Sequence, residues 1–376
     1  MTRLLTSLFG LVVIVLGLLH FAVLPYYDNK LNAVIATESY PVPAAVHAFH
    51  EIAFVADMHA DSLLWGRNLG KRQQRGHADL PRLRAGGIDL QVFSAVTQVP
   101  RGLNYDSNPA DSDSLPILFV AAWRSPATWF DPRQRALAQA EELFHLAETS
   151  ALSLVLRRDD LFADGLKGLL ALEGMQALGG REAALDELHA AGYRMMGLAH
   201  FFDNAIAGSA HGSEKYGLTD LGRRLIPRME TLGITIDLAH ASTAAFTDTL
   251  ALARKPVVVS HGGVKGTCAG VRNLSDDQLR AIAGNGGVVG IGYWKGAVCD
   301  ASLAGITRAI NYAISIAGIN HVGLGSDFDG SIAAPFDATG LPRLTASLLA
   351  AGLSQDDVGK LLGGNFRRVL DANLLE

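Results

Sequence analysis

Short apolar runs alternate with longer amphipathic segments along most of the chain. Eight of these runs are about four to eight residues long, rich in β-branched side chains and bounded by turn residues, which is typical of buried strands. Strands that alternate with helices form a parallel sheet, and eight strands can close it into a barrel. The predicted fold is therefore α/β, a (β/α)8 TIM-like barrel, with strands at 52–57, 90–96, 169–173, 194–200, 235–240, 257–261, 288–293 and 322–327.

Several connections between these strands carry helix-like stretches with start and stop signals. Thr219 and Ser275 are N-cap residue types, and each is followed by acidic residues in the first turn. Glycines at 192, 233 and 318 stand where helices should end. The predicted helices cover 181–191, 218–232, 243–253, 275–283 and 303–317.

Two connections, 100–166 and 201–217, depart from this regularity and are predicted to be loops or lids over the barrel mouth. The first contains an apolar patch at 117–123, followed by Trp129 and Phe130. Packing on the core is the preferred interpretation of this patch. Lining of the substrate pocket and contact with a membrane are the alternatives.

The N-terminal run at 4–24 has only Thr6, Ser7 and His20 as polar interruptions and carries no charged side chain. It is long enough to span a bilayer as a transmembrane helix. A cleaved signal peptide is the alternative, because Arg3 provides a short positive region before the run. No clean cleavage site follows, so an uncleaved anchor is favoured.

Arg3 also bears on orientation, because positive residues tend to stay on the cytoplasmic side of a span. The catalytic part is therefore expected outside the cytoplasm, in the periplasm of a bacterium, or secreted if the segment is cleaved. The predicted organisation is a membrane anchor or signal segment at 1–27, a tether at 28–50 and a (β/α)8 metallo-hydrolase domain at 51–376.

Composition narrows the classes further. The 376 residues are 49% hydrophobic and 18% charged, which suits a large core and argues against wholesale disorder. A net charge of -5 without a basic cluster argues against a nucleic-acid partner. The two cysteines, Cys268 and Cys299, lack metal-binding spacing. A disulfide in an exported chain and two unpaired buried thiols both remain open.

The predicted strands end in side chains that bind metals or carry protons. His59 and Asp61 share one face of their strand because side chains alternate with period two. Imidazole and carboxylate ligands suit zinc, with manganese, iron and cobalt as alternatives. Five ligands exceed one open tetrahedral site, so two ions are predicted, bridged by Glu173 and by a nucleophilic hydroxide. The predicted ligands are His59, Asp61, Glu173, His240 and His261.

Three further residues are candidates for the reaction itself. Asp327, at the end of the last strand, is predicted to move a proton to the leaving amine, with a ligand role as the alternative. Asp329 competes with it only if the strand continues, and Gly330 indicates a turn. His200 could bind an oxyanion, and Arg272 could form a fork with a substrate carboxylate. Structural and surface roles are the alternatives for these two.

An ordered set of motifs closely resembles the membrane dipeptidase (renal dipeptidase) family over roughly residues 54–370. Individually the motifs are unspecific, but their order and spacing make the resemblance strong. They are Asp57-Met58-His59-Ala60-Asp61, Leu172-Glu173-Gly174, Leu198-Ala199-His200, Ile236-Asp237-Leu238-Ala239-His240, Val259-Ser260-His261, Arg272-Asn273 and Gly325-Ser326-Asp327-Phe328-Asp329-Gly330.

The resemblance implies a barrel with two zinc ions that hydrolyses dipeptides, commonly with a D-residue or glycine at the C-terminal position. It also implies a homodimer. By the resemblance, one zinc is held by His59 and Asp61 and the other by His240 and His261, with Glu173 between them. The resemblance also implies that His200 binds the substrate carbonyl, Arg272 binds the terminal carboxylate and Asp327 carries protons.

Two other functions remain as alternatives. A binuclear-metal amidohydrolase for another amide, lactone or phosphoester would use the same ligands. A non-catalytic, membrane-tethered binding protein could keep the barrel for recognition alone. Retention of every proposed ligand argues against the second alternative.

Overall fold

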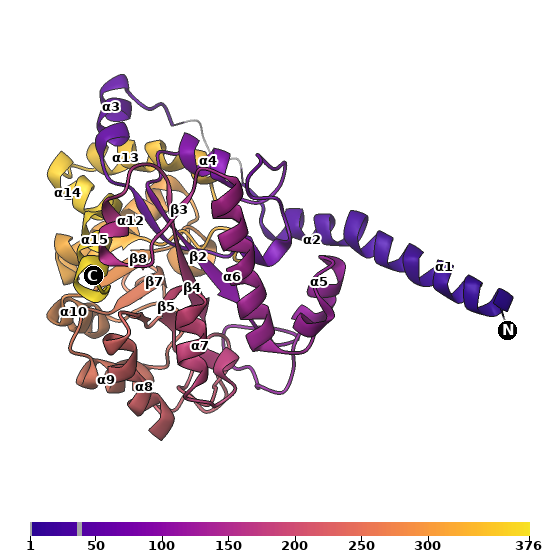
Figure 1. Ribbon diagram of the computed structural model, residues 1–376. Coiled ribbons are helices and arrows are strands. Elements are labelled where there is room, and N and C mark those ends of the chain that lie inside the picture. Colours follow the sequence, from indigo (N-terminus) through magenta and orange to yellow (C-terminus); the bar gives the residue numbers. More distant parts are fainter. Residues whose placement is uncertain (1, 36–39) are drawn as a thin grey trace.

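The computed structural model describes residues 2–35 and 40–376, and its centre is a closed parallel barrel (Figure 1). The strands follow the order β2-β1-β9-β8-β7-β6-β5-β4, and a pairing between β2 and β4 closes the ring. A two-residue strand, β3 (Ser153–Leu154), pairs with β4 outside the ring. The eight barrel strands are β1 (Ala56–Ala60), β2 (Leu90–Val96), β4 (Lys167–Glu173), β5 (Tyr193–Gly197), β6 (Thr235–Asp237), β7 (Val258–Gly262), β8 (Val288–Ile291) and β9 (Val322–Leu324). The predicted (β/α)8 barrel is confirmed.

Some strand boundaries differ from the prediction. Strand β1 begins at Ala56 because helix α3 (Ala44–Ile52) occupies the residues before it. Strands β6 and β9 stop before His240 and Asp327, where the backbone turns into the left-handed region, with φ of 62° and 60°. Both side chains therefore stand on turns just beyond the strands.

The predicted helices form, with boundaries shifted by up to three residues. Thr219 caps α8 (Asp220–Thr231) by accepting a hydrogen bond from the Gly222 amide at 3.0 Å. Ser275 caps α10 (Asp276–Asn285) in the same way, from the Gln278 amide at 3.3 Å. The other helices around the ring are α4 (Leu80–Ala85), α6 (Pro132–Thr149), α7 (Ala184–Ala190), α9 (Thr243–Leu252), α11 (Lys295–Val298), α12 (Leu303–Ala317), α13 (Leu341–Ala350), α14 (Gln355–Gly359) and α15 (Asn365–Asn373).

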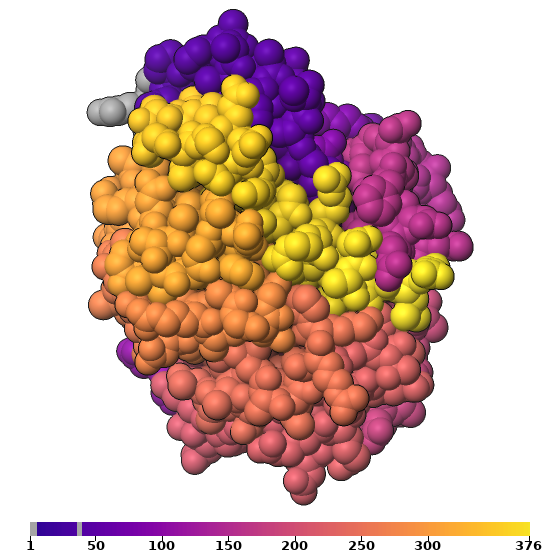
Figure 2. Space-filling model, turned by 90° about the vertical axis from the view of Figure 1, so that its left-hand side faces the viewer, coloured from indigo at the N-terminus to yellow at the C-terminus, as the bar shows by residue number. Residues whose placement is uncertain are grey.

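One end of the barrel is covered by the C-terminal helix α15. Phe366, Val369 and Leu370 of this helix belong to the same buried cluster as Leu90 at the start of β2 and Val258 at the start of β7. Figure 2 looks onto this end, with the C-terminal residues lying across its middle. The opposite end, where the strands finish, is left for the loops that carry the chemistry.

The connection 100–166 was predicted to be a loop or lid, and this is wrong for the parts of it that are helical. It contains α5 (Leu115–Ala121) and the 18-residue helix α6, which packs on β2. The apolar patch in this connection is divided. Phe119 and Ala121 are buried, whereas Ile117, Trp123 and Phe130 are exposed, so core packing explains only part of it.

The N-terminal segment is one helical rod made of α1 (Thr2–Leu18), a π-helical turn at Leu19–Val23 and α2 (Leu24–Leu31) (Figure 1). Within it, Thr6–Leu31 is long and apolar enough to cross a membrane, and almost none of it is buried. The rod is fixed at its domain end by Asp28, a buried carboxylate that lies 2.6 Å from Arg75 Nε and 3.5 Å from Arg67 Nε. The segment predicted as a tether thus begins inside the fold.

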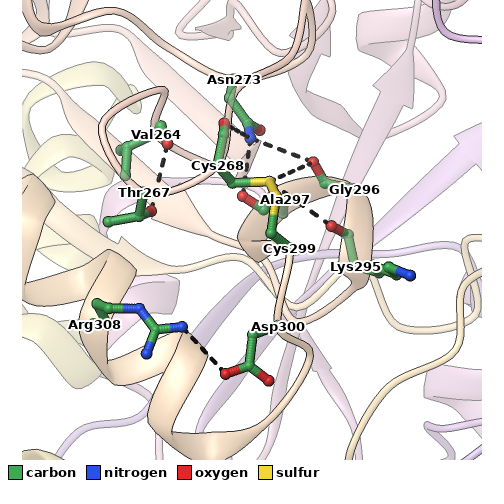
Figure 3. Close-up of a disulfide and its surroundings, with 10 residues drawn as sticks. All are labelled: Val264, Thr267, Cys268, Asn273, Lys295, Gly296, Ala297, Cys299, Asp300 and Arg308. Carbon is green, nitrogen blue, oxygen red and sulfur yellow. Dashed lines mark hydrogen bonds and ion pairs between the residues drawn. A yellow bond between two sulfur atoms is a disulfide. The ribbon is translucent and has the colours of Figure 1, made fainter.

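Cys268 and Cys299 form a disulfide, which resolves the two alternatives for the cysteines (Figure 3). The bond joins the loop after β7 to the residue that ends α11. The Asn273 side chain reinforces this junction by donating hydrogen bonds to the carbonyl oxygens of Cys268 at 2.7 Å and Ala297 at 3.0 Å.

Candidate metal centre

The five predicted ligands converge at the carboxyl ends of the strands. His59 lies in β1 with Asp61 directly after it, Glu173 is the last residue of β4, and His261 lies in β7. His240 follows β6 on its left-handed turn. Parallel strands finish at the same end of a barrel, so residues far apart in sequence meet there.

Glu173 lies at the centre of this group. Its Oε1 atom is 3.2 Å from His240 Nε2 and 3.6 Å from both His59 Nε2 and His261 Nε2. His59 Nε2 is in turn 3.3 Å from Asp61 Oδ1. One carboxylate therefore contacts both pairs of side chains, as the bridging role requires.

The donor atoms fit divalent cations. His59 Nε2, Asp61 Oδ1 and Glu173 Oε2 are buried without a hydrogen-bond partner, although buried polar atoms normally have one. His240 Nε2 and His261 Nε2 face each other at 3.0 Å, and two neutral imidazoles pointing lone pairs at one place suit a shared cation. Three groups of side chains have their ligand atoms within 4.8 Å of one another. The groups are His59 with Asp61 and Glu173, Glu173 with His240 and His261, and His59 with His261 and Asp327.

The electrostatics of the site lead to the same conclusion. Burial alone would lower the pKa of His59, but the carboxylates of Asp61 and Glu173 outweigh it and raise the pKa to about 10. Burial also raises the pKa of Glu173 and of Asp327 well above the usual range. Three carboxylates gathered in a buried site make a position where positive charge is stabilising.

Outer polar groups hold the ligands in place. Ser260 Oγ donates to Asp237 Oδ2 at 2.5 Å and lies 2.9 Å from Nδ1 of His261, so the imidazole has a fixed partner behind it. On the other side, Asp57 accepts hydrogen bonds from the Ser326 amide and hydroxyl at 2.7 and 2.6 Å. This carboxylate ties β1 to the turn that carries Asp327. Sequence reasoning assigned no role to these residues, although Asp57 stands two positions before His59 on the same face of the strand and Ser260 directly precedes His261.

His200 and Arg272 both line the cavity. His200 Nε2 is 3.4 Å from Glu173 Oε2, and burial lowers the pKa of His200 to about 3, so the ring is neutral. Arg272 is buried and donates to the carbonyl oxygen of His261 at 2.6 Å, which aims its guanidinium along the cavity wall. The surface position that was the alternative for Arg272 is therefore wrong.

Asp327 and Asp329 have separate environments. Asp327 lines the cavity, with Oδ1 at 4.0 Å from His59 Nε2. Asp329 points away from the cavity and is buried in a polar network, with Oδ2 at 2.6 Å from Arg67 Nη2 and 2.6 Å from the Ser62 hydroxyl. Strand β9 has ended before both residues, and Gly330 closes a turn onto Asp327. Asp327, not Asp329, is thus the carboxylate that faces the metal-binding side chains.

The cavity beside these residues has a volume of about 200 Å³. That is below the roughly 300–1,000 Å³ typical of pockets for drug-sized ligands, so it suits a small substrate. Its aromatic walls, Tyr105, Phe201 and Trp294, were not predicted. The Trp294 Nε1 donates to the Tyr105 hydroxyl at 3.1 Å, which joins the irregular segment before α5 to the other side of the cavity.

Comparisons with known proteins agree with this geometry. The family described as membrane dipeptidase (Peptidase family M19) matches residues 44–374. Dipeptidase aclJ of Aspergillus oryzae is 30% identical over 84% of this chain and 77% of its own length. The solved structure of a metallopeptidase described as dipeptidase AC has a TM-score of 0.71 at 26% identity, covering 86% of this chain and 99% of its own.

A metallopeptidase from Rhodobacter sphaeroides, solved with a phosphinate mimic of the dipeptide L-Ala-D-Ala, also has a TM-score of 0.71 at 26% identity, and the match covers 85% of this chain and 99% of that one. The family match includes all the strand ends from which the predicted metal ligands project. The chain therefore belongs to the membrane dipeptidase family and is a metal-dependent dipeptidase.

Proposed function

We propose that this protein is a two-zinc dipeptidase that accepts a D-residue or glycine at the C-terminal position of its substrate. The observation that carries the proposal is the convergence of five buried histidine and carboxylate ligands around Glu173. Support for the substrate comes from the relative whose structure contains a mimic of L-Ala-D-Ala. The cavity volume of about 200 Å³ favours a substrate as small as a dipeptide.

His59 and Asp61 would hold one zinc ion and His240 and His261 the other, with Glu173 shared between them. When bound, the ions would lower the pKa of a water molecule and polarise the substrate carbonyl. His200, a neutral ring, would donate its Nε2–H to the carbonyl oxygen as negative charge develops on it, in the tautomer that gives up the 3.4 Å contact of Nδ1 with the Gln98 carbonyl oxygen. Asp327 would accept a proton from the attacking water and deliver it to the leaving amine, so that no proton is gained or lost overall.

The N-terminal rod would anchor the enzyme in a membrane, with the catalytic domain outside the cytoplasm. The continuous helix and the buried ion pairs of Asp28 support an anchor that stays with the domain. A homodimer remains a prediction from the family resemblance alone.

Removal and return of zinc should test the metal and the substrate together. We expect the full chain in detergent micelles to cleave L-Ala-D-Ala and to lose this activity after chelation. Activity should return when two zinc ions are bound per chain, because the proposed reaction needs both ions. Released amino acid and bound zinc would be measured on the same samples. The tripeptide L-Ala-D-Ala-L-Ala is the size control and should be cleaved far more slowly.

Two results would contradict the proposal. Absence of cleavage in protein that holds two zinc ions would favour an amidohydrolase for another amide or ester. Cleavage of L-Ala-L-Ala with rejection of both L-Ala-D-Ala and L-Ala-Gly would remove the D-residue tolerance and leave the dipeptidase activity.

Arg272→Lys should separate substrate binding from catalysis. We expect KM for dipeptides to rise about 10-fold or more, because a lysine cannot reproduce the bidentate fork of a guanidinium on a carboxylate. The matched substrate is the dipeptide amide, which lacks that carboxylate and should lose little with this variant. An equal loss on both substrates would show that Arg272 acts by holding His261 through its carbonyl oxygen.

A further inference from the structure

The domain end of the N-terminal rod packs against helix α5. The His20 ring stacks on the Trp123 side chain with centroids 3.8 Å apart, and its Nδ1 lies 2.9 Å from the Ala121 carbonyl oxygen. Phe21 contacts the edge of the same indole at 5.4 Å. These contacts fix α5 at the level of residues 20 and 21 of the rod, beside which it lies in Figure 1.

The level of that contact in a bilayer follows from the length of the apolar run. A helix rises about 1.5 Å per residue, so the run from Leu4 to Leu24 is roughly 30 Å long, the thickness of the hydrocarbon core. His20 and Phe21 then lie about one helical turn from the end of the run, close to the boundary with the headgroups. Trp123, which touches both, must lie at the same depth, where tryptophan is enriched in membrane proteins.

The side chains around Trp123 have the exposure expected of a membrane-contacting surface. Ile117 is 66% exposed, Trp123 56% and Phe130 79%, whereas Phe119 on the opposite side of α5 is buried against the domain. Contact with lipid would account for the exposure of these apolar side chains. Large apolar side chains that are exposed near a span are otherwise costly in water.

We propose that Ile117, Trp123 and Phe130 form a lipid-contacting surface that enters the outer leaflet of the bilayer that the N-terminal rod spans. This surface would contact the membrane at the headgroup boundary, as amphipathic segments that lie in the membrane plane do. The inference rests on the proposed anchor and adds a second attachment point. Two attachment points, one rod and one surface patch, fix the tilt of the domain.

This orientation places the cavity on the side of the domain that faces the membrane. Leu24 of the rod belongs to the same buried cluster as Leu64 and Val96, and both of these also line the cavity. Asn32, just after the rod, accepts a hydrogen bond at 2.9 Å from the amide of Ser331, another residue of the cavity wall. The opposite end of the barrel is covered by α15 (Figure 2). Substrates would therefore enter from the water layer next to the bilayer.

Site-specific labelling of the full chain tests this surface. Both native cysteines are in the disulfide, so single cysteines can be introduced at Ile117→Cys, Phe130→Cys and, as a control, Phe162→Cys, and labelled with a polarity-sensitive fluorophore. Phe162 is 61% exposed and follows Arg158, whose amide bonds to Leu375 at the far end of the barrel. A label at Val12→Cys in α1 reports insertion of the rod. Dipeptide cleavage by each labelled protein confirms that it is folded.

In phosphatidylethanolamine and phosphatidylglycerol vesicles that contain a lipid with a nitroxide high on its acyl chain, we expect quenching at 117 and 130 and none at 162. Quenching at 12 without quenching at 117 and 130 would overturn the surface while leaving the anchor intact. Lack of quenching at all four positions would overturn both proposals. A third outcome is a label at 117 that is not quenched by the lipid but shows energy transfer to the same label on another chain. This result would assign the surface to a second copy and would also overturn the inference.

Discussion

Replacement of Asp327 by asparagine is expected to lower kcat for dipeptide hydrolysis by about 10²–10⁴-fold, the usual contribution of a positioned acid/base group. Asparagine has the same shape and tolerates the left-handed backbone conformation at this position, where φ is 60°. It cannot accept the proton of the attacking water. Bound zinc and thermal stability should therefore remain as in the unsubstituted enzyme, and both should be measured beside kcat.

Asp329→Asn is the matched control, because it makes the same chemical change two residues away. Asp329 is buried and paired with Arg67 at 2.6 Å, so its substitution removes part of a buried charge network. Loss of one partner of such a network costs about 3–5 kcal/mol of folding free energy. We expect a lowered Tm here, with little change in kcat for the fraction that stays folded. If Asp327→Asn instead loses zinc, Asp327 is a ligand and the proton must be carried by another group.

Glu173→Gln is expected to have the largest effect of all, since one carboxylate oxygen lies within 3.6 Å of His59, His240 and His261. Glutamine keeps the volume but provides a neutral, weaker donor to both ions. The loss in zinc affinity should exceed the roughly 10–100-fold cost of removing an outer partner of a ligand. Zinc per chain would be measured after dialysis against a weak chelator, together with activity at saturating zinc.

Glu142→Gln provides the comparison for Glu173→Gln. Glu142 lies in α6 and pairs with Arg124 at 2.7 Å, away from the cavity that Glu173 lines. This variant should keep two zinc ions and full activity, with only a small change in stability. Normal zinc content in Glu173→Gln would mean that His59 and Asp61 hold one ion, and His240 and His261 the other, without a bridge.

The architecture of the site could be predicted because each ligand follows a recognisable apolar strand. His59 and Asp61 share a face through the period-two alternation of β1, and Glu173 ends the seven-residue strand β4. His240 and Asp327 were assigned to strands, and the structure places them on turns just beyond β6 and β9. The prediction still located them correctly, because a side chain on such a turn stays at the same end of the barrel.

The walls of the cavity could not be predicted in the same way. Tyr105 lies in an irregular segment, and its place in the site depends on how the whole connection folds. That connection includes α6, whose position was not predicted. Helix α6 has polar residues on most of its faces, and its buried side includes Arg135 and Gln139. Arg135 and Gln139 donate hydrogen bonds to the carbonyl oxygens of Thr97 and Val96, partners that no local pattern reveals.

The disulfide between Cys268 and Cys299 would link the proposed extracytoplasmic location to the loop that carries Arg272. Arg272 follows Cys268 in the same loop, and Trp294 immediately precedes α11, so the bond joins the two segments that carry these cavity-lining residues. Disulfides persist in oxidising compartments, whereas cysteines in the cytosol are kept reduced. The predicted metal ligands all lie outside the segment between the two cysteines, whereas Arg272 lies within it. In the proposed extracytoplasmic location this bond would form only after export, so the loop that carries Arg272 would be cross-linked to α11 only there.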